Sequence, residues 1–190
     1  MIEKKYTVAA ADADGFAADA TGAAFALANT VTPDGMAHLV TVENKTGNDH
    51  SDKTILLAGF DADGNAINET ITGPAGSATV TSAKYFRVLD SASAAIGEDT
   101  VDIGWSAAAV TPFHKMNNLK GGAVAVLTGG TINFDLQHTY KVEADGAAFA
   151  KDTNKTANFE ASYAHPVAGV RAKVNSHTSG TLTVQIIEGE

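Results

Sequence analysis

Residues 53–72 read KTILLAGFDADGNAINETIT, and this stretch decides the fold. Its first part, residues 53–60, is a β-branched and apolar run of the kind that forms a strand. The run stops at residues 61–65, where Asp63-Gly64 supplies the positive φ that a tight hairpin turn requires. Residues 66–72 then alternate apolar and polar side chains with a period of two. The stretch therefore predicts a β-hairpin with one face toward a core.

The same kind of pattern recurs on both sides of this hairpin. Upstream, residues 23–27 and 36–42 are strand-like, and downstream residues 78–80, 86–89 and 100–105 are as well. No segment shows the 3.6-residue period of an amphipathic helix. The sequence therefore predicts an all-β fold.

The C-terminal part of the chain contains the longest clean alternation. It places Ile132, Phe134, Leu136, His138 and Tyr140 on one strand face. Four strands are predicted there: residues 121–127, 131–142, 167–174 and 181–187. A turn at Gly129-Gly130 separates the first two, a polar connection covers residues 147–163, and residues 175–180 join the last two.

Small residues from Ser106 to Ala109, followed by Pro112, mark the best domain boundary. We expect a β-sandwich domain over residues 21–108 and a second β-sandwich or jelly-roll-like domain over residues 109–190. Residues 6–8 could form a first strand, but residues 9–20 are rich in Ala and Asp and fit neither a helix face nor a strand, so we expect a short N-terminal arm over residues 1–20.

The hairpin also carries a resemblance to a known group of proteins. Residues 54–65, followed by Glu69-Thr70-Ile71-Thr72-Gly73-Pro74, resemble a "TG-D-DG…ET-TGP" hairpin of tailed-bacteriophage virion structural proteins. In that group "T-T-KYF-V" and a short "V-GW" strand come next, and here residues 79–86 and 101–105 stand in their places. The likeness covers roughly residues 20–105 and, more faintly, the segment ending at Arg171.

The resemblance implies a structural subunit of a phage particle. Among the possible positions in the particle we favour a capsid decoration, or cement, protein that binds the major capsid protein. It would be assembled in the host cytoplasm and located in the virion. A homo-oligomer is expected, with a trimer favoured by analogy with the three-fold positions of such shells. A tail or head-to-tail component, a receptor- or glycan-binding fibre module, and an enzyme are the alternatives, in that order.

Charge and composition restrict the partners. Residues 1–110 hold fifteen Asp or Glu against six Lys or Arg, whereas residues 111–190 hold seven of each, so the net charge of −9 belongs to the first part. Nucleic-acid binding needs clustered cations, and none are present, so no nucleic-acid partner is expected. No apolar run approaches a membrane span and no export signal is visible, so we expect no membrane partner.

No residue pattern predicts catalysis, a cofactor or a metal site. The chain has no cysteine, which excludes disulfides and thiolate sites. The loop at residues 61–65 resembles the start of a calcium loop, but its glycine is fourth and its twelfth residue is Thr72, so a turn is the better interpretation. The six histidines lack the spacing of a local metal site, and no serine lies in a nucleophile-elbow motif.

A contact surface is therefore the remaining kind of site. Adjacent residues of a strand point to opposite faces, so one of Tyr85 and Phe86 should face outward. Trp105 is either a contact residue at the boundary or part of a core. His138 and Tyr140 share the face of the long alternating strand. These five residues are the candidate interface: Tyr85, Phe86, Trp105, His138 and Tyr140.

Overall fold

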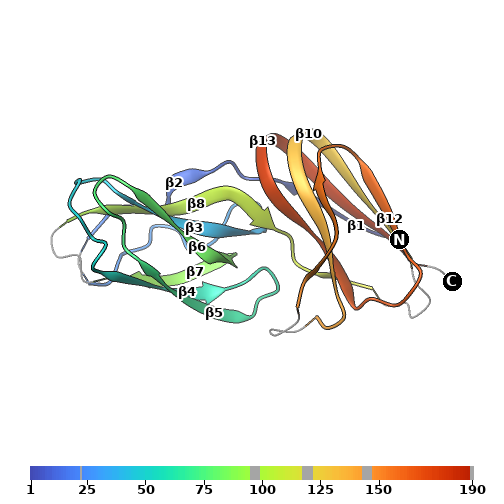
Figure 1. Ribbon diagram of the computed structural model, residues 1–190, viewed down its shortest axis with the longest axis horizontal. Coiled ribbons are helices and arrows are strands. Elements are labelled where there is room, and N and C mark those ends of the chain that lie inside the picture. The colour runs from blue at the N-terminus through green and yellow to red at the C-terminus, as the bar shows by residue number, and fades with distance from the viewer. Residues whose placement is uncertain (22, 95–98, 117–121, 143–146, 189–190) are drawn as a thin grey trace. The chain divides into compact units, whose positions relative to one another are not determined.

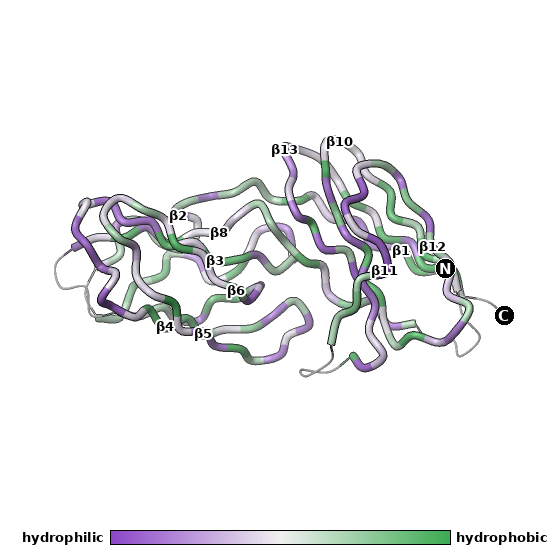
Figure 2. The backbone as a smooth tube through the Cα atoms, in the orientation of Figure 1, coloured by the Kyte–Doolittle hydropathy of each residue, from purple (hydrophilic) through white to green (hydrophobic). Residues whose placement is uncertain are grey.

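The computed structural model describes the chain except for residues 22, 95–98, 117–121, 143–146 and 189–190. The described residues form thirteen strands and no helix, which confirms the all-β prediction (Figure 1). None of them forms a helix long and apolar enough to cross a membrane. Hydrophobic and hydrophilic residues are interspersed along the strands, as the colouring of Figure 2 shows.

The chain divides into two compact units. Unit 1 contains Met1–Ala10, Asp34–Met36 and Ala107–Glu190, and unit 2 contains Ala11–Pro33 and Ala37–Ser106. The main division at Ser106 lies in the stretch of small residues where the sequence predicts a boundary.

Each unit has its own set of strands. Unit 1 contains β1 (Ile2–Thr7), β9 (His114–Lys115), β10 (Gly122–Thr139), β11 (Phe149–Lys155), β12 (Phe159–Tyr163) and β13 (Gly169–Glu188). Unit 2 contains β2 (Asp12–Ala20), β3 (Ala37–Asn44), β4 (Thr54–Phe60), β5 (Ala66–Thr72), β6 (Thr79–Phe86) and β7 (Val88–Ser93). Strand β8 (Val101–Val110) begins in unit 2 and ends in unit 1.

Unit 1 is organised around the antiparallel pair β10 and β13. The turn predicted at Gly129-Gly130 and the connection predicted between the closing strands are absent, because each segment continues as one long strand. Gly130, with a φ of 110°, lies opposite Gly180, which has a φ of 135°. A side chain at Gly180 would approach the Gly129 carbonyl oxygen to 2.0 Å. The paired glycines therefore allow both strands to pass through a conformation that other residues avoid.

The two halves of β10 and β13 have different neighbours. The first half of β10 pairs with β12, whereas the second half pairs with β11. The last part of β13 pairs with β1, and its first part pairs with β9 and the end of β8. Both halves contribute to one core, whose largest members include Phe134, Leu136 and Leu182. This arrangement has the two-layered character of a sandwich.

The N-terminal arm expected over residues 1–20 is instead two strands. Strand β1 pairs with β13 along its whole length, and its Ile2 and Tyr6 pack against the unit 1 core. Strand β2 pairs with β8 at three positions, and its Phe16 is fully buried in unit 2. The Ala- and Asp-rich composition hid β2, whose irregular pairing leaves buried and exposed residues without a clean alternation.

Unit 2 contains the predicted hairpin. Strands β4 and β5 pair in register from Thr54 opposite Thr72 to Phe60 opposite Ala66. In the turn, Gly64 has a φ of 85°, and the Asp61 carboxylate accepts hydrogen bonds from the backbone N–H groups of Asp63 and Asn65. Local bonds thus occupy this carboxylate, as the turn interpretation requires.

The remaining strands of unit 2 complete its core. Strand β7 joins the hairpin to give the sheet order β5-β4-β7, while β6, β3, β8 and β2 are paired in turn. The core includes Phe86 and a pair of rings, Phe16 and Trp105, whose centroids are 5.0 Å apart. The strand expected at residues 23–27 is absent, although Phe25 is buried in this core.

Candidate functional site

The outer face of the β5-β4-β7 sheet is the first candidate surface. Alternate residues of β4, among them Ile55 and Leu57, are buried, so their neighbours point to the other side of the sheet. The strand register places residues of β5 and β7 beside them. We call the resulting set the uncharged sheet face: Thr54, Leu56, Ala58, Phe60, Ala66, Asn68, Thr70, Thr72, Val88, Ser91 and Ser93.

The absence of charge from this set contrasts with its surroundings. Unit 2 holds thirteen Asp or Glu and four Lys or Arg, which gives the unit a charge of −9. Asp90, the extra residue at the irregularity in the β4–β7 pairing, is exposed next to Ser91 and adds a carboxylate at the edge of this set. Leu56 is 47% exposed in the middle of the face. Roughly a quarter to a third of the surface positions of a small domain are charged, whereas the centres of protein interfaces are depleted of charge. The face therefore has the composition of a contact surface.

The opposite side of β5 is tied to the rest of unit 2. The Glu69 carboxylate accepts hydrogen bonds from the backbone N–H groups of Ala83 and Lys84, at 2.7 and 2.8 Å. The Lys84 ammonium donates to the Asn68 carbonyl oxygen at 2.7 Å. These bonds attach the β4–β5 hairpin to β6, so the uncharged sheet face lies on a hairpin that is fixed to the rest of unit 2.

The second candidate surface is a group of aromatic and imidazole rings in unit 1. His138 and Phe149 are cross-strand partners on β10 and β11, with stacked rings 5.8 Å apart. The ring of Tyr140 lies 5.3 Å from that of His138 and 5.7 Å from that of Phe149. We call the group the ring cluster and define it by Tyr140 and Phe149, which are about half exposed, and by His138, Lys151, Tyr163 and His165.

Polar atoms are interleaved with these rings. The Tyr140 hydroxyl and the His165 Nε2 are 3.3 Å apart, and the Lys151 ammonium lies 5.4 Å from the centre of the Tyr163 ring. Burial, followed by the nearby His165 and Lys151, lowers the pKa of His138. Burial, followed by the negative charge of Asp152, raises the pKa of the Tyr163 hydroxyl. Both side chains are therefore held in their neutral forms near neutral pH.

Another buried histidine of unit 1 supports the fold rather than a surface. His114 lies on β9, and its Nε2 is 3.3 Å from the Tyr6 hydroxyl on β1. Burial, together with the positive charge of Lys4, lowers the pKa of His114 to about 4. The folded unit therefore keeps this imidazole neutral.

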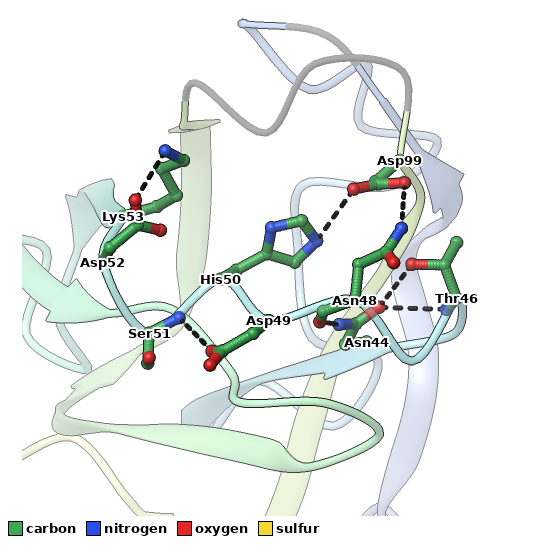
Figure 3. A network of polar contacts seen from close by, with 9 residues as sticks. All are labelled: Asn44, Thr46, Asn48, Asp49, His50, Ser51, Asp52, Lys53 and Asp99. Atoms are coloured by element: carbon green, nitrogen blue, oxygen red, sulfur yellow. Dashed lines mark hydrogen bonds and ion pairs between the residues drawn. The ribbon is translucent and has the colours of Figure 1, made fainter.

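A polar network in unit 2 surrounds the buried His50 (Figure 3). Its Nε2 lies 3.5 Å from an Asp99 carboxylate oxygen, and the Asn48 amide donates to the other oxygen at 2.7 Å. Asn44 accepts hydrogen bonds from the backbone and hydroxyl of Thr46. Within the described residues, His50 Nε2 has no hydrogen-bond partner, and no group of three or more His, Cys, Asp or Glu side chains could hold a metal ion. The network organises the loop after β3.

The five interface residues predicted from the sequence are separated by the structure. Phe86 is fully buried and Trp105 is 7% exposed, so both belong to the unit 2 core. Tyr85 is half-buried on β6, pointing away from Phe86 as the strand alternation requires. His138 and Tyr140 come together in the ring cluster.

Sequence reasoning missed most of both surfaces. Phe149, Lys151 and Tyr163 lie in a stretch whose polar composition suggested a connection, yet it forms β11 and β12. The uncharged sheet face was visible in the alternate positions of the hairpin, where Thr54, Leu56 and Thr70 stand without a charged neighbour on the same side.

No protein-family model, curated protein or solved structure matches this chain. The function is therefore argued from the surfaces of the two units.

Proposed function

We propose that the chain is a structural, non-enzymatic subunit of a tailed-phage particle. In this proposal it is a capsid decoration protein whose uncharged sheet face docks on the major capsid protein. The observation that carries the proposal is this face, a sheet surface whose eleven outward strand positions carry no charge although the unit has a charge of −9. The same unit contains almost all of the residues that resemble virion proteins, roughly 20–105.

The chemistry of the face suits such a contact. Leu56 and the half-buried Phe60 provide apolar area that gains free energy when it leaves water. The surrounding threonine and serine hydroxyls can donate and accept hydrogen bonds without the desolvation cost of a charge. The docking strength of one copy need not be high, because a homo-oligomer, with a trimer favoured, would bind a shell through several copies at once.

The position in the particle is tested by imaging. The full chain, labelled at its C-terminus, is added to particles that lack it, and the label is located by electron microscopy. A signal spread over the shell is the expected result. A signal confined to the tail or to the head-to-tail junction would refute decoration and favour the tail alternative.

The contact surface is tested by two matched substitutions. Leu56→Glu places a charge in the centre of the uncharged sheet face, and Leu127→Glu places the same charge at an exposed leucine of unit 1. We expect Leu56→Glu to weaken shell binding by at least about tenfold, because a buried unpaired charge is costly at an interface. Leu127→Glu should bind as the unaltered chain does. Equal binding by both variants would show that the face is not the contact.

A further inference from the structure

The ring cluster of unit 1 offers a ligand-binding chemistry that docking through unit 2 does not use. Tyr140 is 55% exposed and Phe149 is 47% exposed, and the two rings are inclined at 57° with centroids 5.7 Å apart. His138 stands behind both, stacked on Phe149 and edge-on to Tyr140. The Tyr140 and Phe149 rings thus pack against the His138 ring and are partly exposed to solvent.

The support of these rings is well defined. Phe149 is the register partner of His138 across β10 and β11, and Tyr140 follows the end of β10 directly. Tyr163 closes β12 and is buried, with its ring 5.6 Å from that of His138. Three strands therefore fix the cluster, and a ligand would meet a preformed surface rather than one it must order.

Hydrogen-bonding groups lie at the margin of the exposed rings. The Tyr140 hydroxyl and His165 Nε2 form one polar pair, with the imidazole stacked at 24° against the Tyr140 ring. The Lys151 ammonium lies over Tyr163, and within the described part of the chain no ion pair is seen for it. The margin therefore holds a hydroxyl, an imidazole and an ammonium ready to contact a polar ligand.

The cluster is small for a protein partner. A stable protein contact covers roughly 800 Å² on each side. Apart from Tyr140 and Phe149, the large exposed apolar residues of unit 1 among those described are Met1, Leu127 and Ile187. These three lie at the chain start, in the first half of β10 and at the end of β13, outside the ring cluster. Two half-exposed rings with a polar margin fit a small ligand better.

We propose that the ring cluster is a saccharide-binding platform. A sugar ring has a face of C–H groups that carries partial positive charge and packs on the negative face of an aromatic ring. Its hydroxyls meanwhile need donors and acceptors at the edge of the contact, where the cluster provides them. Tyr140 and Phe149 provide the stacking surface, while His165 and Lys151 provide polar contacts. Lys151 also favours a sugar that carries a carboxylate, because its charge is opposite.

The test uses the full soluble chain without any particle, so its outcome does not depend on where unit 2 docks. Four probes are titrated separately: a maltooligosaccharide, a chitooligosaccharide, an oligogalacturonate and a sialylated lactose. Binding is followed by the NMR signals of the His138 and His165 rings and by calorimetry. We expect at least one probe to bind at a single site and to shift both imidazole signals. Stronger binding of the two acidic probes would identify Lys151 as a contact.

Substitutions then locate the site. Tyr140→Ala and Phe149→Ala should each weaken binding by at least about tenfold, since stacking residues dominate small contacts. Tyr140→Phe keeps the ring and should retain most of the affinity. Leu127→Ala, at an exposed residue outside the cluster, is the matched control and should bind normally.

Two results would overturn the proposal. One is that no probe binds to a chain whose unfolding midpoint shows it to be folded. The other is that a probe binds equally well to the Tyr140→Ala and Phe149→Ala variants. Concentration-dependent self-association that these two substitutions abolish, without saccharide binding, would assign the cluster to contacts between copies instead.

Discussion

Unit 1 and unit 2 are both built from antiparallel strands, but they obtain their cores in different ways. Unit 1 relies on two long strands, β10 and β13, which pair over almost their whole length and change neighbours halfway. Unit 2 uses shorter strands joined by turns, with β4 and β5 as its central hairpin. Unit 1 has nine acidic and nine basic residues, whereas unit 2 has thirteen against four.

The difference separates two ways in which a sequence encodes strands. In unit 2, Asp-Gly in the β4–β5 turn ends one strand and starts the next. In unit 1, glycines with positive φ occur inside strands, and the pairing of the strands continues through them. The candidate surfaces of the two units also differ: unit 2 presents the uncharged sheet face, and unit 1 presents the ring cluster.

The largest expected effect concerns the paired glycines of unit 1, Gly130 and Gly180. Gly180→Ala should lower the free energy of unfolding of unit 1 by about 3 kcal/mol or more, since it forces a side chain into a strained backbone and into a neighbouring carbonyl. Far-UV circular dichroism in denaturant measures the loss. Gly35→Ala is the matched control: Gly35 has a φ of 74°, but its added Cβ would meet nothing within 4 Å. It should cost about 1 kcal/mol, because an alanine there must adopt the left-handed backbone region.

The same variant tests how separate the two cores are. Trp105 belongs to the unit 2 core, so its fluorescence reports on that unit. We expect Gly180→Ala to leave the fluorescence transition nearly unchanged. An equal shift of both signals would show that the two units unfold as one body.

The next effect is a pH dependence confined to unit 1. An unfolded histidine has a pKa of 6.5, and burial lowers that of His114 to about 4. Protons therefore bind the unfolded state more readily, so stability is complete above pH 6.5 and is lost as pH falls toward 4. After allowance for partial exposure, the loss should be about 2 kcal/mol. His114→Phe should flatten this part of the pH profile in denaturant titrations. A profile that the substitution leaves unaltered would contradict the assignment.

A smaller effect is expected for the hydrogen bonds that attach β5 to β6 in unit 2. Glu69→Ala removes the acceptor of two backbone N–H groups on β6, so it should destabilise unit 2 by about 1 kcal/mol. Trp105 fluorescence in denaturant is the measurement. Glu160→Ala, at an exposed position of unit 1, serves as the control. If Glu69→Ala lowers the free energy of unfolding no more than the control does, the Glu69 hydrogen bonds do not stabilise unit 2.

The smallest effect on stability is expected at the ring cluster. Tyr140→Ala and Phe149→Ala should each change the free energy of unfolding by no more than about 1 kcal/mol, because both side chains are about half exposed. Thermal unfolding provides the measurement. Losses above about 2 kcal/mol would mean that the cluster is a part of the unit 1 core.

How much the sequence predicts depends on the unit. The all-β class follows from the alternation of residues, and the β4–β5 hairpin follows from its apolar run and Asp-Gly turn. At Gly129-Gly130 the same reasoning predicts a turn, because local sequence does not reveal that Gly180 lies opposite and that the partner strand continues as well. That information resides in pairing between distant segments.

The candidate surfaces also differ in how much of each can be predicted from local sequence. Leu56 and Thr70 are cross-strand partners within a hairpin, so the uncharged sheet face is implicit in a continuous stretch of sequence. The ring cluster brings together residues from three strands, and only His138 and Tyr140 share a recognisable alternation. Phe86 and Trp105 were candidates because they are aromatic, but aromatic character does not distinguish a core from an interface.

The central claim is that the uncharged sheet face of unit 2 attaches the chain to a phage shell. The most direct measurement is a titration of shells that lack the chain with three proteins: the unaltered chain, Leu56→Glu and Leu127→Glu. The account predicts saturable binding by the unaltered chain and by Leu127→Glu, and binding at least about tenfold weaker by Leu56→Glu. Failure of the unaltered chain to bind shells, or equal binding by all three proteins, would contradict it.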